Sequence, residues 1–219
     1  MCVNFRPLTI AQIQALKLTP PQFEYDEESY PKAKCPILIW SDTRLEWRDA
    51  QFGLLPGWCK EKDYKAETHN ARIESVDRKV SFQSAWRNNQ FALVPMQAFY
   101  EPRYGTSSLS ERWRIERLDQ QPSMAAAIYE IWHGQSETIH SFSLLTINAD
   151  QHPLMKQFHK AEVEKRSIIV MARPLWKTWL RADHRSAKTM LHEIDPSQYH
   201  AFADARPIFK TPSLNLDLF

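Results

Sequence analysis

The chain has 219 residues, a formal net charge of +2 and 43% hydrophobic residues. A charge this close to zero excludes a strongly basic nucleic-acid-binding arm, although a local basic groove is compatible with it. The four glycines form neither a GxGxxG nor a P-loop pattern, which argues against a nucleotide-cradling loop.

The three cysteines, Cys2, Cys35 and Cys59, form no CxxC pair, and their odd number does not suit a disulfide framework. The start MCVNFRPLT lacks the apolar core of a signal peptide, and no apolar run approaches membrane-spanning length. We therefore expect a soluble cytoplasmic protein with free thiols and no membrane partner. Without HExxH or a tight Cys/His cluster, we expect no metal and no cofactor.

Hydrophobic periodicity indicates more strands than helices. The predicted strands lie in residues 36–40, 45–55, 91–104, 112–118, 123–132, 140–149 and 165–171. The predicted helices lie in residues 9–18, 75–89, 173–181 and 189–202, and residues 19–36 are predicted as a long irregular loop. We expect the long strand 91–104 to be broken near its prolines. The pattern favours an α+β fold, with one domain over residues 1–219 built on a curved, barrel-like, mostly antiparallel sheet with peripheral helices.

Three short stretches carry side chains suited to chemistry. THNARIES places Asn70, Arg72 and Glu74 in one polar turn, which suits either a sugar-phosphate ligand or a helix start. QAFYEPRY ends an apolar strand at Glu101, which is either a buried acid or base or a solvated strand end. MKQFHKAEVEKRSIIVM holds His159, a residue type that titrates near neutral pH, whereas the other histidines are interpreted as surface or packing residues.

The start MCVNF raises a further possibility. Methionine aminopeptidases remove Met1 when the next residue is small, and the mature chain would then begin with Cys2. A free α-amine and a thiol on adjacent carbons can condense with an aldehyde and close a five-membered ring. The alternative is that Cys2 is an ordinary hydrophobic residue.

In combination, these pieces closely resemble the SRAP (SOS response-associated peptidase) family of abasic-site processing proteins, which crosslink themselves to damaged DNA. The resemblance rests on Cys2, the YPKAKCP loop, FGLLPGW, NARIES, the FYE strand end, the TINA strand and a histidine before EKRSIIV. It runs from Cys2 to about Trp176.

The resemblance implies a set of site residues. Cys2 matches the crosslinking cysteine, and Asn70, Glu101 and His159 match the other catalytic residues. Arg72 matches a phosphate-contacting arginine, Trp58 a DNA-facing aromatic residue, and Thr146 a polar residue near the DNA backbone. Asn4 stands where relatives usually have arginine, so we expect it near a flanking phosphate.

The resemblance also implies a function. We expect a monomeric sensor of abasic sites in single-stranded DNA, associated with the nucleoid when bound to DNA, which shields the lesion through a thiazolidine at Cys2. The family is also described as peptidase, hydrolase or lyase. Departures occur at Asn4, at Pro102 after the glutamate, and at Cys35 and Cys59 in the loops.

Two alternatives from other classes stay open. An N-terminal-cysteine amidohydrolase would attack an amide with the Cys2 thiolate, but its oxyanion hole is often built from an Asn-Gly turn, which this chain lacks. A non-catalytic nucleic-acid or protein-binding module would leave Cys2 incidental.

Overall fold

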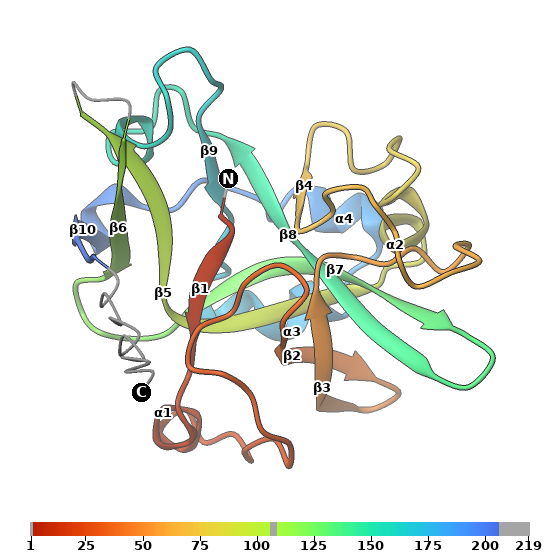
Figure 1. The fold of residues 1–219 in the computed structure, drawn as a ribbon. Coiled ribbons are helices and arrows are strands. Elements are labelled where there is room, and N and C mark those ends of the chain that lie inside the picture. Colours follow the sequence, from red (N-terminus) through yellow and green to blue (C-terminus); the bar gives the residue numbers. More distant parts are fainter. Residues whose placement is uncertain (1, 106–108, 206–219) are drawn as a thin grey trace, which may run out of the picture.

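The strands form one mixed sheet in the computed structural model, which describes residues 2–105 and 109–205 (Figure 1). Over these residues the strands are β1 (Asn4–Pro7), β2 (Lys34–Ser41), β3 (Arg44–Phe52), β4 (Asn70–Arg72), β5 (Phe91–Tyr104), β6 (Ser110–Arg117), β7 (Ser123–His133), β8 (Thr138–Asn148), β9 (Arg166–Ile168) and β10 (Tyr199–Ala203). The predicted α+β class with a mostly antiparallel sheet is confirmed.

The helices are short and peripheral. They are α1 (Ile10–Ala15), α2 (Gln83–Arg87), α3 (Trp176–Leu180) and α4 (His184–Lys188), with 3-10 turns η1 (Met155–Gln157), η2 (Arg173–Leu175) and η3 (Pro196–Gln198). The predicted first helix begins where Thr9 and Gln12 form a capping box, each side chain accepting from the other residue's backbone N–H. No helix in the described part of the chain is long and apolar enough to cross a membrane.

Five strands close into a barrel in the order β5, β2, β3, β8, β7 and back to β5. All of these pairings are antiparallel except that of β3 with β8. Inward-facing side chains fill the interior with aromatic rings, and Phe52 stacks on Phe142 with centroids 5.2 Å apart. Closure leaves these five strands without a free edge along their paired segments.

The strands β5 and β8 are longer than the barrel needs, and their C-terminal halves carry the remaining strands. The second half of β5 pairs with β1 and β6, and the second half of β8 pairs with β4 and β9. The N-terminal end of β1 therefore lies between the extensions of β5 and β8, near β9 and β4 (Figure 1).

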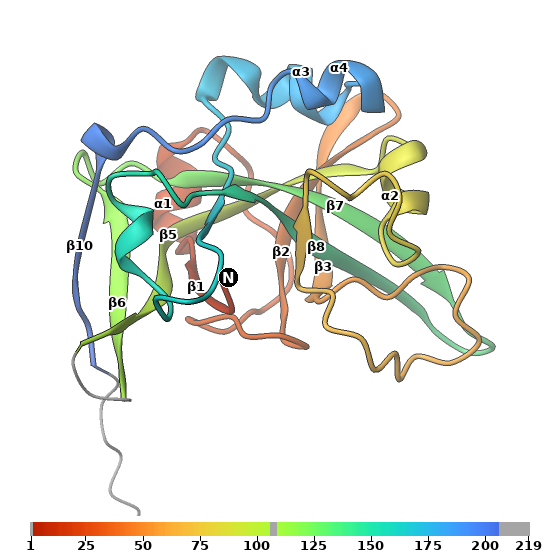
Figure 2. The same cartoon turned by 90° about the horizontal axis from the view of Figure 1, so that it is seen from above.

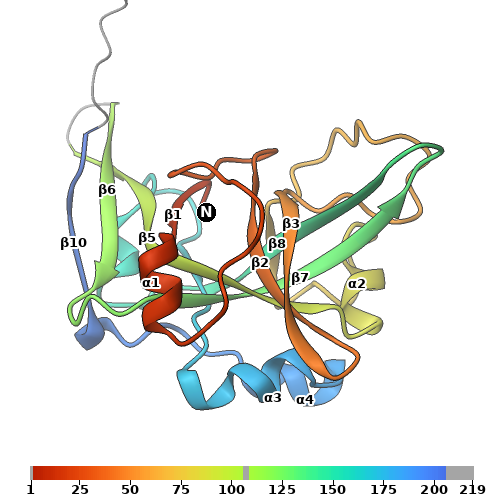
Figure 3. The same cartoon turned by 90° about the horizontal axis from the view of Figure 1, so that it is seen from below.

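The two faces of the sheet differ. Figures 2 and 3 show α3 and α4 on one side and the N-terminal end of β1 on the other. The α3 side is anchored by Trp179, which is fully buried and donates its indole N–H to the carbonyl of Ala92 at 2.9 Å. The face that carries the N-terminus is left free of helices α3 and α4.

Two sequence predictions of helix were wrong in extent or type. Residues 75–82 form successive turns, and only α2 is helical within the predicted segment 75–89. Residues 189–202 form an irregular segment, then η3 and β10, because Pro196 interrupts the helical pattern and residues 199–203 pair with β6. The strand β5 runs unbroken through Pro95 and Pro102, contrary to the predicted break.

Candidate functional site

Cys2 lies in the interior at the mouth of the barrel. Its side chain is only 1% exposed and belongs to the same apolar cluster as Phe5 and Phe99. The antiparallel register of β1 with β5 pairs Asn4 with Tyr100, which directs the start of the chain toward Glu101. The pairing of the first strand with β5 therefore sets the position of Cys2.

Asn70 holds Cys2 from the opposite side. Its amide nitrogen donates to the carbonyl oxygen of Cys2 at 2.7 Å. In β4, side chains alternate between faces, so Ala71 enters the core while Asn70 and Arg72 share the other face. The amide oxygen of Asn70 is buried and has no hydrogen-bond partner among the described residues.

Glu101 and His159 form an adjacent acid–base pair. His159 Nε2 lies 2.9 Å from Glu101 Oε2, and the Glu101 side chain is 1% exposed. Glu101 is buried because the strand alternation that turns Phe99 into the barrel also turns Glu101 inward. His159 adopts a positive φ of 62° and donates its backbone N–H to the carbonyl of Pro102 at 2.7 Å, which fixes the imidazole beside the strand.

The environment of Cys2 disfavours the thiolate. Burial, and after it the negative charge of Glu101, raises the pKa of the Cys2 thiol far above its usual range. The thiol Sγ lies 3.4 Å from the carbonyl oxygen of Asn4. The thiol is thus neutral at physiological pH, unlike a cysteine activated for nucleophilic attack.

Arg72 leaves β4 on the outer side of the site and is half exposed. Its guanidinium lies 2.6 Å from Glu164 Oε2. Glu164 also accepts from the buried Arg166 at 2.8 Å, and Arg166 makes two further hydrogen bonds to Glu74 at 2.9 and 2.8 Å. This chain of ion pairs connects the NARIES turn to β9 and holds Arg72 next to the site.

Two of the residues predicted to bind DNA lie inside the protein. Thr146 is 1% exposed, and its hydroxyl lies 3.5 Å from the carbonyl of Ala71 and 3.3 Å from Arg166. Asn4 is 3% exposed, and its amide oxygen accepts from Arg112 Nη2 at 2.9 Å. The strand register turns both side chains inward, where their hydrogen bonds are internal, and a contact of either residue with DNA stays a prediction.

Trp58 lies on the surface, as a stacking residue must. It is 52% exposed and packs edge-on against Tyr64 with ring centroids 5.7 Å apart. Its indole N–H lies 3.4 Å from the carbonyl of Val80, which anchors the ring while about half of the residue stays exposed.

Two cavities adjoin the site. One, of about 670 Å³, is lined by His159 and by Lys156, Lys160 and Lys165. The other, of about 390 Å³, is lined by residues that include Val3, the neighbour of Cys2, and His69, the neighbour of Asn70. His159 thus lines a lysine-rich hollow, and the chain neighbours of Cys2 and Asn70 line a second, partly apolar one.

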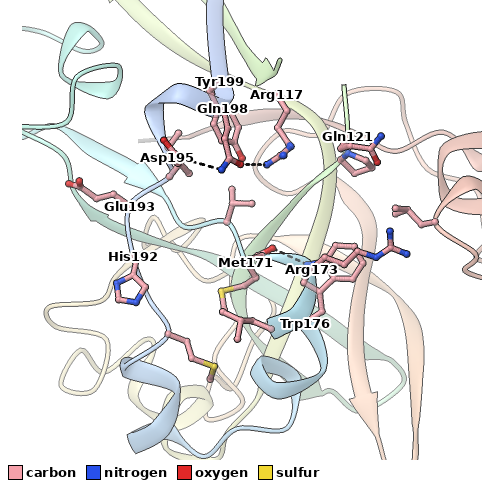
Figure 4. A pocket seen from close by; sticks show the side chains of 17 residues that line it. Arg117, Gln121, Met171, Arg173, Trp176, His192, Glu193, Asp195, Gln198 and Tyr199 are labelled. Atoms are coloured by element: carbon pink, nitrogen blue, oxygen red, sulfur yellow. Dashed lines mark hydrogen bonds between the residues drawn. The ribbon is translucent and has the colours of Figure 1, made fainter. Parts of the chain in front are cut away.

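A third cavity, of about 470 Å³, is separate from the site (Figure 4). Its polar wall is a hydrogen-bonded series in which Arg117 donates to Gln198 at 2.8 Å and Gln198 donates to Asp195 at 3.1 Å. None of the residues predicted for the site lines it. Within residues 2–105 and 109–205, no group of three or more His, Cys, Asp or Glu side chains is arranged to hold a metal ion.

A family model described as SOS response associated peptidase (SRAP) matches residues 4–208. The chain belongs to the SRAP family. Among curated relatives, the "Abasic site processing protein YoqW" of Bacillus subtilis strain 168 is 22% identical over 163 residues, which cover 73% of this chain and 67% of YoqW. The YoqW of Bacillus phage SPbeta matches to the same extent.

Solved structures share the fold. A protein from Bordetella bronchiseptica superposes with a TM-score of 0.85 at 25% identity, covering 94% of this chain and all of that one. A protein from Bacteroides thetaiotaomicron gives a TM-score of 0.78 at 17% identity, covering 92% of this chain and 91% of that one. The expected SRAP fold, a barrel with peripheral helices, is confirmed.

Sequence analysis missed several residues around the site. His69 directly precedes Asn70, yet it was interpreted as a surface or packing residue because an isolated histidine carries little information. Glu164 and Arg166 stand in the polar run EKR, where nothing in the sequence distinguishes a buried arginine from a solvated one. Only the pairing of β9 with β8 buries Arg166 and brings Glu164 to Arg72.

Proposed function

We propose that this protein recognises abasic sites in single-stranded DNA and links itself covalently to them through Cys2 after removal of Met1. The observation that carries the proposal is the convergence of three chain segments on Cys2, with Asn70 bound to its carbonyl and the Glu101–His159 pair beside it. Family membership and the name of YoqW support a role at abasic sites.

The chemistry follows from the ring-opened sugar, which carries an aldehyde at C1′. The α-amine of Cys2 attacks C1′, and loss of one water gives an imine. The Cys2 thiol then adds to the imine carbon, forming a C–S bond while its proton passes to the nitrogen, and a thiazolidine results. The adduct outlasts a simple imine because hydrolysis has to break two bonds to the same carbon.

The other residues position groups and move protons. Glu101 accepts a proton from the α-amine, so that the neutral amine attacks, and His159 transfers a proton to and from the sugar during ring opening and reversal. Asn70 orients the first residue, and its unpaired amide oxygen is an acceptor for the new N–H or a sugar hydroxyl.

The thiol environment favours this proposal over an amidohydrolase. A cysteine hydrolase needs a thiolate, whereas burial and Glu101 raise the pKa of the Cys2 thiol. In thiazolidine formation the amine reacts first and the thiol adds to an electrophile already held beside it. A neutral, buried thiol is sufficient for that second step.

The deciding experiment incubates the protein with single-stranded DNA that carries one abasic site. We expect a shifted band that survives heating with the wild-type chain. Cys2→Ser retains an amine and is expected to give only a labile adduct that borohydride traps. Release of ammonia from glutamine without a DNA adduct would support the amidohydrolase. If the protein forms no adduct and releases no ammonia, the simple binding module is supported.

A further inference from the structure

We infer that the cavity of about 390 Å³ beside Val3 is a subsite for the nucleotide next to the abasic site, with His69 stacking on its base. This inference rests on the proposed function, because the abasic sugar at Cys2 is what brings a neighbouring nucleotide to the cavity.

The position of the cavity is the first argument. Cys2 and Val3 are consecutive, as are His69 and Asn70, and Asn70 binds the Cys2 carbonyl at 2.7 Å. In each pair, one residue is directed to the sugar (Cys2 or Asn70) in the proposed complex, and the other (Val3 or His69) lines the cavity. A strand whose abasic sugar meets Cys2 therefore places an adjacent nucleotide at this opening.

The lining is the second argument. Phe52, Leu54 and Leu55 form the buried floor of the cavity, each at most 1% exposed, and they support the half-buried His69, whose ring lies edge-on to Phe52 at 5.9 Å between centroids. The His69 ring and the Val3 side chain, which is 42% exposed, are the surface that a flat aromatic base can contact, and the cavity lies within the size range of small-ligand sites. Burial lowers the pKa of His69, so its imidazole is neutral at pH 7 and suited to stacking.

The third argument is continuity with the exposed aromatic surface. Tyr64 also lines the cavity, and Trp58 packs against Tyr64 at 5.7 Å between centroids. The cavity thus connects the neighbour of Cys2 to the exposed indole of Trp58. Three lysines, Lys32, Lys62 and Lys65, line the cavity together with the acids Asp63 and Glu67, so one positive charge is left over for the phosphate of the bound nucleotide.

Base removal tests the subsite directly. The probe is single-stranded DNA with a stable tetrahydrofuran abasic analogue, bound to the Cys2→Ala protein so that no covalent step contributes. Further probes lack the base of the 5′ or the 3′ neighbour as well. We expect loss of one of these two bases to weaken binding about tenfold, the equivalent of one stacked base.

Variants of His69 locate the effect. His69→Ala is expected to weaken binding to the probe with both neighbouring bases and to have little effect on the probe that lacks the stacked base. His69→Phe keeps an aromatic ring and is expected to restore the difference in affinity between the probe with both neighbouring bases and the probe that lacks the stacked base. His200→Ala, which removes a histidine on β10, serves as the matched control and is expected to leave the affinity for both probes unchanged.

Two results would overturn the subsite. One is binding that changes less than twofold whichever neighbouring base is removed. The other is a His69→Ala loss of equal size with and without the neighbouring base. Crosslinking of the wild-type chain to a true abasic site is measured in parallel: a normal crosslink with no base dependence rejects the subsite alone, whereas absence of any crosslink rejects the proposed function.

Discussion

At the scale of the residue, the site separates two kinds of polar side chain that look alike in the sequence. Glu101 and His159 face each other across 2.9 Å next to the start of the chain. Asn4 and Thr146 are equally polar, yet their hydrogen bonds are internal. Their location decides which of them act in the chemistry that we propose.

The Glu101–His159 pair gives a kinetic prediction. Glu101→Gln keeps the shape but removes the proton acceptor, so adduct formation is expected to slow by about a hundredfold or more. His159→Ala is expected to act mainly on ring opening and on reversal of the link. Single-turnover rates of formation and release, measured on DNA with one abasic site, check both. Unchanged rates in the two variants would remove the pair from the mechanism.

Asn4 gives a prediction about stability. An arginine at this buried position would lie beside the guanidinium of Arg112, which already donates to Asn4 at 2.9 Å. Glu28 lies 3.4 Å from the Asn4 amide nitrogen but already accepts from Arg112 at 2.8 Å, so a second buried guanidinium would lack a carboxylate of its own, and Asn4→Arg is expected to lower the free energy of unfolding by about 3 kcal/mol.

The control for that experiment is Val3→Arg, which changes the adjacent residue, whose side chain is 42% exposed. Its effect on stability is expected to stay within about 0.5 kcal/mol. Urea titration measures both. A fully stable Asn4→Arg protein would mean that the side chain at position 4 can reach the surface, as the sequence alone suggested.

At the scale of the element, β4 is three residues long and carries both Asn70 and Arg72 because side chains alternate along a strand. Its pairing with β8 and the ion pair of Arg72 with Glu164 fix its outer end. A phosphate that binds Arg72 has to compete with Glu164 for the same guanidinium.

This competition predicts opposite effects of two variants in the Cys2→Ala background. Arg72→Gln is expected to weaken binding to single-stranded DNA and to flatten the log–log salt dependence by about 0.7. Glu164→Gln is expected to tighten binding by up to about fivefold, because an exposed ion pair contributes roughly 0.2–1 kcal/mol. Salt titrations of binding give both values. If the log–log salt dependence has the same slope with Arg72→Gln as with the unchanged Arg72, then Arg72 neutralises no phosphate.

The elements also show how far sequence patterns extend. Strands such as β5 and β7 are predictable because long apolar, β-branched or aromatic runs have few other conformations available. The helix predicted over residues 189–202 fails because pairing of residues 199–203 with β6 is a long-range contact invisible to a local pattern. Asn70, Glu101 and His159 were identified by resemblance, but the burial of Asn4, Thr146 and Arg166 depends on strand register, which no local pattern gives.

At the scale of the whole molecule, the closed barrel buries more polar groups than the site requires. Glu130 of β7 is 6% exposed, and its Oε2 has no hydrogen-bond partner among the described residues. Burial raises the pKa of Glu130 above its ordinary value of 4.5. At pH values between 4.5, the pKa of Glu130 in the unfolded chain, and its raised pKa in the fold, the folded state therefore binds more protons than the unfolded state.

The sign of the pH effect follows. Stability contributed at Glu130 falls as the pH rises from 4.5 through the folded-state pKa, and the loss is constant above it. Glu130→Gln removes this titration, so it is expected to gain stability relative to the wild type at pH 7 and to lose that gain below pH 4.5. Urea unfolding across this pH range checks it. A relative stability that does not change with pH would mean that Glu130 titrates normally in the fold.

The central claim is that the α-amine and the thiol of one residue, Cys2, both bond to the abasic sugar. The most direct measurement is the intact mass of the heat-stable adduct between the wild-type chain and DNA with one abasic site. We predict the mass of the chain without Met1 plus the DNA minus one water. An adduct that still contains Met1 would contradict the claim, because a peptide bond would then occupy the amine that has to form the ring.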